Sequence, residues 1–229
     1  MEIQIIATGS SGNCFAVGDG ETRLLLDAGI PLARIERGVK FSLSAFAGCL
    51  LTHEHQDHSK AAFDLLSKGL PLYCSRGTQR ALGLPQSYYV RTAATCMAFD
   101  VGSFEVMPFE AQHDAAEPLC YLIYSKCTHE KLLFITDCAY VSYRFSCLTH
   151  LLIECNYMTQ LLYRSTEPAL ADRIVRSHMS LETCLRFLAA QDLSTIQQIY
   201  LIHISNTRGD GALMQRAVAR STGKEVILP

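Results

Sequence analysis

Short apolar segments bounded by Gly, Pro and Asp occupy the first half of the chain and predict β-strands. The predicted strands cover residues 3–7, 15–17, 22–26, 49–52, 72–74 and 103–108. One helix is predicted among them, at residues 59–68, because Ala61, Ala62, Leu65 and Leu66 share one helical face. Asp57 precedes it as a candidate N-terminal cap.

The second half repeats this order of strands closed by helices. Its predicted strands cover residues 120–125, 131–136, 151–154 and 200–204, and its predicted helices cover 167–176, 181–191 and 211–221. Ser180 and Asp210 are suitable caps for the last two helices, and Pro168 fits the first turn of the first. Two rounds of strands closed by helices predict an α+β protein with two sheets packed face to face and helices outside.

Composition is that of one globular domain, and we expect residues 1–229 to form it. Apolar residues make up 49% and charged residues 18%, as in proteins whose central strands are covered on both faces. The chain starts directly in a predicted strand, and no apolar run could span a bilayer. Ten scattered cysteines without C-x-x-C pairing indicate buried thiols in a reducing compartment rather than a disulfide framework. We therefore expect a cytoplasmic protein without a membrane partner.

Net charge argues against general attraction to a polyanion, since the formal value is −2. Any nucleic acid would need a local basic patch. Basic residues do gather in the second half: Arg164, Arg173, Arg176, Arg186, Arg208, Arg216, Arg220 and Lys224. Most of these fit solvated helix faces, and the alternative is that two or three line a phosphate-binding groove.

Three imidazoles and a carboxylate follow the predicted strand 49–52 within a few residues, in the run His53-x-His55-x-Asp57-His58. An extended segment points residues i and i+2 the same way, so His53 and His55 can hold one metal ion. Asp57 and His58 can then serve a second ion. Imidazole and carboxylate are ligands for zinc, manganese and iron alike. The alternative is a solvated polar turn.

Further polar groups stand at the ends of predicted strands, where a side chain can be held rigidly. Asp27, His113, Asp137 and Glu154 follow four of the apolar runs, and His203 interrupts a fifth. Any one of them could be a simple capping residue. Five in a chain that already has the histidine cluster favour a shared site.

In this order the residues resemble the five signature motifs of the metallo-β-lactamase superfamily over nearly the whole chain. The resemblance implies a four-layer αββα sandwich with a dinuclear site at one edge. The implied ligands are His53, His55 and His113 for the first ion, Asp57, His58 and His203 for the second, and Asp137 between them. Asp27 is implied to fix the histidine-rich loop without binding metal.

Five local motifs resemble the YycJ/WalJ-like group of this superfamily, which is akin to RNase Z and RNase J. The motifs are Gly9-Ser10-Ser11-Gly12-Asn13-Cys14, His113-Asp114-Ala115-Ala116-Glu117-Pro118, Glu154-Cys155-Asn156-Tyr157, His178-Met179-Ser180 and His203-Ile204-Ser205. By position, Glu154 and His178 match a pair that cooperates in acid catalysis in RNase Z-like enzymes. The alternative for His178 is a surface histidine before the cap Ser180.

The resemblance implies a hydrolase that uses a metal-bridging hydroxide, with Asp57, Asp137, Glu154 and His178 as its catalytic set. The loop carrying Ser10, Ser11 and Asn13 is either a plain hairpin turn or a contact for substrate phosphate.

We expect a phosphodiesterase or nuclease acting on DNA or RNA, with two divalent ions, zinc or manganese and less obviously iron. The stretch between Asp137 and His203 is too short for the extra domain of RNase J, and no insertion resembles the transfer-RNA-binding arm of RNase Z. Hydrolysis of a cyclic nucleotide, a thioester or a lactone is the alternative activity. A non-catalytic binding protein is the least favoured reading, because no expected ligand is lost. If the chain self-associates, a homodimer is the default.

Overall fold

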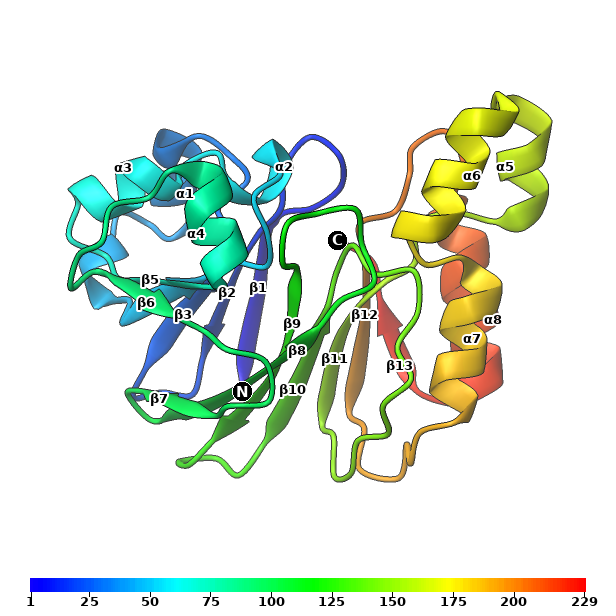
Figure 1. Ribbon diagram of the computed structural model, residues 1–229. Coiled ribbons are helices and arrows are strands. Elements are labelled where there is room, and N and C mark those ends of the chain that lie inside the picture. Colours follow the sequence, from blue (N-terminus) through cyan, green and yellow to red (C-terminus); the bar gives the residue numbers. More distant parts are fainter. The chain divides into compact units, whose positions relative to one another are not determined.

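The protein is described from a computed structural model of residues 1–229, which describes every residue except the side chain of Ser165. The chain divides into two compact units (Figure 1). Unit 1 comprises Met1–Glu110 and Ala115–His129, and unit 2 comprises Ala111–Asp114 and Glu130–Pro229. That residues 1–229 form one domain stays a prediction.

A six-stranded sheet forms much of unit 1. Its strands, in spatial order, are β1 (Glu2–Ala7), β2 (Cys14–Gly18), β3 (Arg23–Leu26), β4 (Gly48–Leu50), β5 (Leu72–Cys74) and β6 (Val90–Thr92). Pairing is antiparallel from β1 to β3 and parallel from β3 to β6. The first five strands lie where the sequence predicts them. The sequence pattern missed β6, which is short and lacks apolar alternation.

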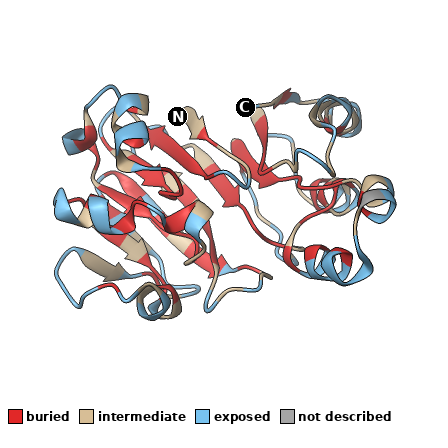
Figure 2. Ribbon diagram, turned by 90° about the horizontal axis from the view of Figure 1, so that it is seen from above, coloured by how far each residue is buried: buried red, intermediate tan, exposed pale blue. Residues whose placement is uncertain are grey.

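Three helices cover one face of this sheet: α1 (Leu32–Gly38), α3 (Ala62–Ser67) and α4 (Arg76–Leu82), with a short 3₁₀ helix η1 (Leu43–Ala45) among them (Figure 1). Leu25 and Leu72 of the strands belong to one buried apolar cluster with Ile35 of α1 and Leu65 of α3. Figure 2 shows this burial: the strands are buried, and the outer faces of the helices are exposed. Sheet and helices therefore share one apolar core, the main favourable term in folding.

The helix predicted at residues 59–68 is broken in two, and the expectation that Asp57 caps it is wrong. Helix α2 (Gln56–Ser59) has His55 as its N-cap, and Asp57 lies inside its first turn. The chain leaves the helical path before α3 because the Ala61 N–H donates to the carbonyl of Ala28, at 2.8 Å. This tertiary hydrogen bond overrides local helix propensity.

Three further strands of unit 1 pair antiparallel with one another and do not belong to the six-stranded sheet: β7 (Phe99–Val101), β8 (Phe104–Glu110) and β9 (Leu119–Ser125). Strand β9 faces the segment that leaves β4. The hydroxyl of Tyr121 donates to the Leu51 carbonyl at 2.6 Å, and the Leu119 N–H donates to the Thr52 carbonyl at 2.9 Å. The backbone just before the histidine cluster is thus held by β9.

Unit 2 contains four parallel strands: β10 (Lys131–Ile135), β11 (His150–Glu154), β12 (Gln198–Ile202) and β13 (Glu225–Ile227). Its helices are α5 (Thr159–Ser165), α6 (Pro168–Ser177), α7 (Leu181–Ala189) and α8 (Gly211–Thr222). Helices α6 to α8 confirm the prediction, and Ser180 and Asp210 cap α7 and α8 as expected. Strand β13 and helix α5 were not predicted.

Parallel pairing brings the carboxyl ends of β10, β11 and β12 to one edge of the sheet, where ligand sites form in open α/β sheets. Strand β12 ends at Ile202, so His203 follows this strand and does not interrupt it, contrary to expectation. The polar residues after all three strands are therefore delivered to the same edge. No helix in the described part of the chain has both the length and the apolarity needed to cross a membrane.

Tyr121→Phe should lower the free energy of unfolding by about 1–3 kcal/mol, because the buried Leu51 carbonyl loses its hydrogen-bond donor. Urea unfolding followed by circular dichroism measures this. Tyr163→Phe, at a side chain that is 61% exposed, is the control and should change stability by less than about 0.5 kcal/mol. Equal effects of the two substitutions would show that the Tyr121 contact does not stabilise the fold.

Candidate metal centre

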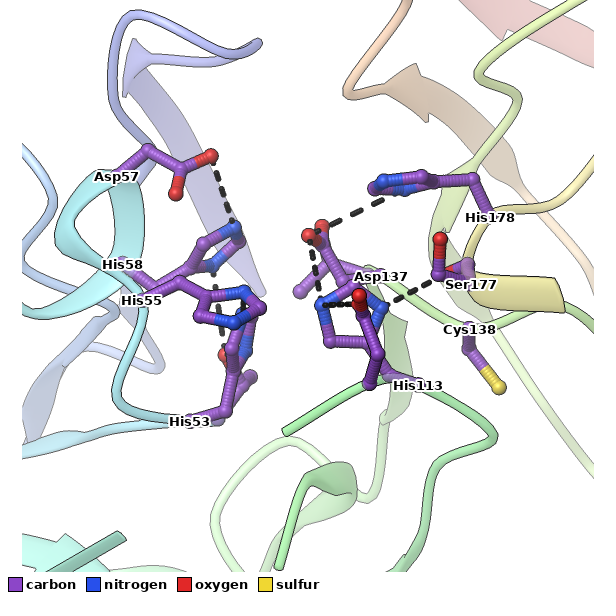
Figure 3. Close-up of polar contacts among 12 residues, drawn as sticks. His53, His55, Asp57, His58, His113, Asp137, Cys138, Ser177 and His178 are labelled. Carbon is purple, nitrogen blue, oxygen red and sulfur yellow. Dashed lines mark hydrogen bonds and ion pairs between the residues drawn. The ribbon is translucent and has the colours of Figure 1, made fainter. Parts of the chain in front are cut away.

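The histidine cluster of unit 1 occupies the turn after β4, which carries His53 and His55, and the short helix α2, which carries Asp57 and His58. The Nε2 atom of His53 lies 3.1 Å from the Nδ1 atom of His55, and the His53 and His58 rings lie 4.3 Å apart between centroids. In Figure 3 the Asp57 carboxylate is directed at the His58 ring, and the distance from Oδ2 to Nε2 is 3.6 Å. Three imidazoles and a carboxylate thus gather at the end of one strand.

Asp27 fixes this turn from the loop that follows β3. Its carboxylate is fully buried and accepts hydrogen bonds from the Thr52 N–H and hydroxyl, at 2.8 and 2.9 Å. The Nδ1 atom of His58 lies 2.7 Å from Asp27 Oδ2. Burial raises the pKa of Asp27, and the hydrogen bonds from His58 and Thr52 partly offset this. Asp27 therefore holds the His58 ring through its Nδ1 atom.

Asn13 ties the β1–β2 hairpin loop to the same turn. Its side chain is fully buried, and its amide nitrogen lies 3.2 Å from the Asp57 carbonyl and 3.0 Å from His58 Nε2. Its amide oxygen accepts from the Gly9 N–H at 2.9 Å. Ser10 and Ser11 are exposed at the tip of the loop. Asn13 thus has a structural role in this loop, and a contact of the loop with substrate phosphate stays a prediction.

Gly29 makes this close approach possible. A Cβ atom there would lie 1.7 Å from the Asp57 carbonyl oxygen, a distance that backbone atoms cannot tolerate. The Gly29 N–H also donates to the Asn13 carbonyl at 2.8 Å. The loops carrying Asn13, Gly29 and Asp57 therefore pack with their backbones in contact.

In unit 2, Asp137 follows β10 and contacts two histidines. Its Oδ2 lies 3.6 Å from His113 Nε2, and its Oδ1 lies 3.3 Å from His203 Nδ1. The Nδ1 atom of His113 donates to the Ser177 carbonyl at 2.7 Å, which leaves Nε2 on the side of Asp137 (Figure 3). Burial lowers the pKa of His113, so this ring is held in the neutral form that binds metals.

Glu154 is the fully buried carboxylate at the end of β11. Its Oε2 accepts from the Cys138 and Met179 N–H groups, at 2.9 and 3.1 Å. Its Oε1 lies 2.7 Å from His178 Nδ1 and 3.0 Å from His203 Nδ1. Burial alone would raise the pKa of Glu154, but these two histidines more than offset it and the pKa is lowered.

His178 lies between α6 and α7, and its side chain is 20% exposed. Burial would lower its pKa, but the Glu154 carboxylate outweighs burial and the pKa is raised. Ligand atoms of Asp137, Glu154, His178 and His203 all lie within 4.8 Å of one another. The residue at the α6–α7 junction is thus part of the polar cluster and not an isolated surface histidine.

The sequence analysis did not identify two residues that hold histidines of the site, Asn156 and Ser177. The Asn156 amide donates to the His203 carbonyl at 2.8 Å and lies 3.1 Å from His203 Nδ1. Asn156 stood inside a recognised motif, so a role could have been suspected. Ser177 acts through its backbone carbonyl, for which the sequence carries no signal.

The left-handed backbone is a shared property of three site residues. Asp27, Asp137 and His203 have φ values of 58°, 45° and 53°. Non-glycine residues pay a conformational cost in this region, and such strain is concentrated at functional sites. Each residue directly follows, or nearly follows, the end of a strand, and the positive φ turns its side chain out of the strand direction.

A family model described as a beta-lactamase superfamily domain matches residues 22–204. The chain belongs to the metallo-β-lactamase superfamily. Two relatives belong by name to the YycJ/WalJ-like group that the local motifs resemble. They are exodeoxyribonuclease YycJ of Bacillus anthracis and exodeoxyribonuclease WalJ of Streptococcus pneumoniae. The first is 30% identical over 222 residues, which cover 90% of this chain and 83% of the relative. The second is 30% identical over 227 residues, covering 90% and 82%.

The fold is shared with a solved structure of the superfamily. The metallo-beta-lactamase fold protein YhfI of Bacillus subtilis aligns with a TM-score of 0.76 at 16% identity, over 99% of this chain and 95% of that one. The α+β class and the metallo-β-lactamase fold, expected from the sequence as an αββα sandwich, are therefore confirmed, as is the YycJ/WalJ-like branch.

Asn13→Ala should destabilise the protein by about 1–3 kcal/mol, because the part-buried Gly9 N–H loses its side-chain acceptor and the Asp57 carbonyl loses one of its two donors from Asn13. Thermal or urea unfolding measures the loss. Ser11→Ala, in the same loop but exposed, is the matched control and should stay within about 0.5 kcal/mol of the natural protein. If Asn13→Ala instead leaves stability unchanged and weakens only substrate binding, the structural role is wrong.

Proposed function

We propose that this protein is a metal-dependent exonuclease that hydrolyses DNA. The observation that carries the proposal is its similarity, over most of both chains, to two relatives named exodeoxyribonuclease. The broader expectation of a metal-dependent hydrolase of nuclease or phosphodiesterase type is confirmed by these relatives, by the superfamily match and by the His/Asp clusters. We further propose a cytoplasmic location, with a homodimer as the form to test first.

Two divalent ions are the proposed cofactors, and zinc or manganese suits the donor set. We assign them, on the superfamily's pattern, to His53, His55 and His113, to Asp57, His58 and His203, and to Asp137 as the shared ligand. The donor chemistry supports this assignment, because Asp27 and the Ser177 carbonyl each engage the Nδ1 atom of a proposed ligand histidine and leave Nε2 for metal. Binding through His58 Nε2 would replace its present contact with the Asn13 amide.

Bound divalent ions supply a water nucleophile of low pKa and offset charge on a phosphate group. The protein's own groups would handle the protons. Asp137 would accept the proton of the water that attacks phosphorus, and His178 would protonate the leaving oxygen as its bond to phosphorus breaks. His178 is suited to this step because Nδ1 pairs with buried Glu154, which leaves the Nε2 proton for the substrate. Asp57 would hold its ion and orient the water.

Metal content tests the ligand assignment. The natural protein should carry about two equivalents of divalent metal, and His53→Ala and Asp57→Ala should each remove roughly one of them. Inductively coupled plasma mass spectrometry of protein grown without added ions measures this. His129→Ala changes an exposed histidine outside the cluster and should leave the metal content unchanged. Loss of metal from the His129 variant alone would contradict the assignment.

Leaving-group dependence tests the acid role. His178→Ala should retain metal but slow DNA cleavage by about a hundredfold or more, since general acid catalysis contributes at least that much for a poor leaving group. Hydrolysis of bis-nitrophenyl phosphate should fall far less, because nitrophenolate leaves without protonation. Similar losses on both substrates would remove His178 from the role of acid.

One set of substrates tests both whether the protein is an exonuclease or an endonuclease and which substrate it prefers. The metal-loaded protein should degrade linear single-stranded DNA and leave circular single-stranded DNA intact. RNA, a cyclic nucleotide and a thioester are tested beside them, and preference for any of these would replace DNA in the proposal. Activity on the circle would indicate an endonuclease.

A further inference from the structure

A groove in unit 2 begins at the loop that follows Asp137. It has a volume of about 570 Å³, within the range of roughly 300–1,000 Å³ found for small-ligand sites. One wall is the loop from Ala139 to Arg144, and the other is the outer face of α7 with Thr183 and Arg186. Nothing in the chemistry described above uses these side chains.

The groove carries exposed aromatic rings together with positive charge. Tyr140 and Tyr143 line it and are 55% and 45% exposed, although large aromatic side chains usually bury most of their surface. Arg144 and Arg186 line it as well, and the lining contains no acidic residue among those described. Arginines beside accessible aromatic rings are the combination with which proteins bind single-stranded nucleic acid.

The loop that carries these rings is held in place by hydrogen bonds at both ends. Cys138 donates its N–H to buried Glu154, at 2.9 Å, and its thiol to the Tyr140 carbonyl, at 3.1 Å. Gln191, after α7, donates to the Tyr143 carbonyl at 3.2 Å and accepts from the Phe145 N–H at 2.9 Å. The aromatic rings are thus presented by a fixed backbone, and little ordering entropy would be lost on binding.

The groove also lies close to the proposed reaction site. Ala139 is two residues from Asp137, so their Cα atoms are at most about 7.6 Å apart. The Ala139 N–H is fixed by the Gln112 carbonyl at 2.9 Å, next to His113. A strand stacked on Tyr140 would therefore pass beside the residues assigned to the cleavage step.

We propose that this groove binds the single-stranded DNA substrate, with bases stacked on Tyr140 and Tyr143 and phosphates paired with Arg144 and Arg186. The inference rests on the proposed DNA nuclease function and specifies which form of DNA enters the site. A duplex is not suited to the groove, because its bases are stacked on each other and offer no free face to the tyrosines. Near-neutral total charge is consistent with a patch of this kind, since the attraction is local.

Binding is tested by fluorescence anisotropy with a labelled oligothymidylate of about twelve nucleotides, whose phosphorothioate linkages prevent cleavage during the measurement. Tyr140→Leu and Tyr143→Leu should each weaken binding roughly tenfold, the effect expected for the loss of one stacked base. Tyr88→Leu, at a 74% exposed tyrosine of unit 1, should have no effect. Binding equal to that of the natural protein in both groove variants would overturn the proposal.

Salt dependence and a small substrate complete the test. Arg144→Ala with Arg186→Ala should reduce the slope of log Kd against log salt by about 1.4, the loss of two phosphate contacts, whereas Arg216→Ala, at an exposed residue of α8, should not. The control variants Tyr88→Leu and Arg216→Ala, at exposed residues outside the groove, should hydrolyse bis-nitrophenyl phosphate at the natural rate. If none of the proteins cleaves any phosphodiester while the oligonucleotide still binds through the tyrosines, the nuclease function fails and the groove stands. If the tyrosine variants only dissociate a dimer, the groove's occupant is a second copy of the chain and the DNA site is wrong.

Discussion

Each unit buries one carboxylate completely, Asp27 in unit 1 and Glu154 in unit 2. A buried charge is costly unless hydrogen bonds and an opposite charge compensate it, so the surrounding backbone must arrange its donors around the carboxylate. Asp27 receives the Thr52 N–H, and Glu154 receives the N–H groups of Cys138 and Met179. Both carboxylates use their remaining oxygen on histidine. These hydrogen bonds hold the loops that carry the candidate site residues to their strands, because breaking them would leave a buried carboxylate without its donors.

Three of the candidate site residues also share an unusual backbone conformation. Asp27, Asp137 and His203 stand at positive φ where the chain turns away from β3, β10 and β12. Such a conformation persists only where the surroundings determine it fully. Asp27 is fixed by its own hydrogen bonds, and His203 is held at its carbonyl by Asn156. Strain at the strand ends is therefore supported by the hydrogen-bond networks around the same residues.

The proposed chemistry and the proposed recognition use one loop in two ways. Its first residues, Asp137 and Cys138, face inward to the histidines and Glu154, and its later residues expose two tyrosines and Arg144. Gln191 fixes the outer part as Glu154 fixes the inner part. A rigid connection of this kind would hold a bound strand in a fixed position relative to the proposed reacting groups, as catalysis by positioning requires. Arg186, one of the arginines that sequence reasoning could not assign, takes part in the groove.

The sequence by itself determined the family, most strands, the later helices and the candidate ligands. These depend on local signals: apolar runs with Gly, Pro and Asp between them, and ligand residues at short spacing such as His53 to His58. The tertiary structure decided the break before α3, because the Ala61 N–H finds a partner in the loop at Ala28. It also gave Asn13 a structural role, and it joined Tyr140 and Arg186 in one groove. Such features depend on hydrogen bonds and surfaces between segments far apart in the chain, and no local pattern of residues records which segments will meet.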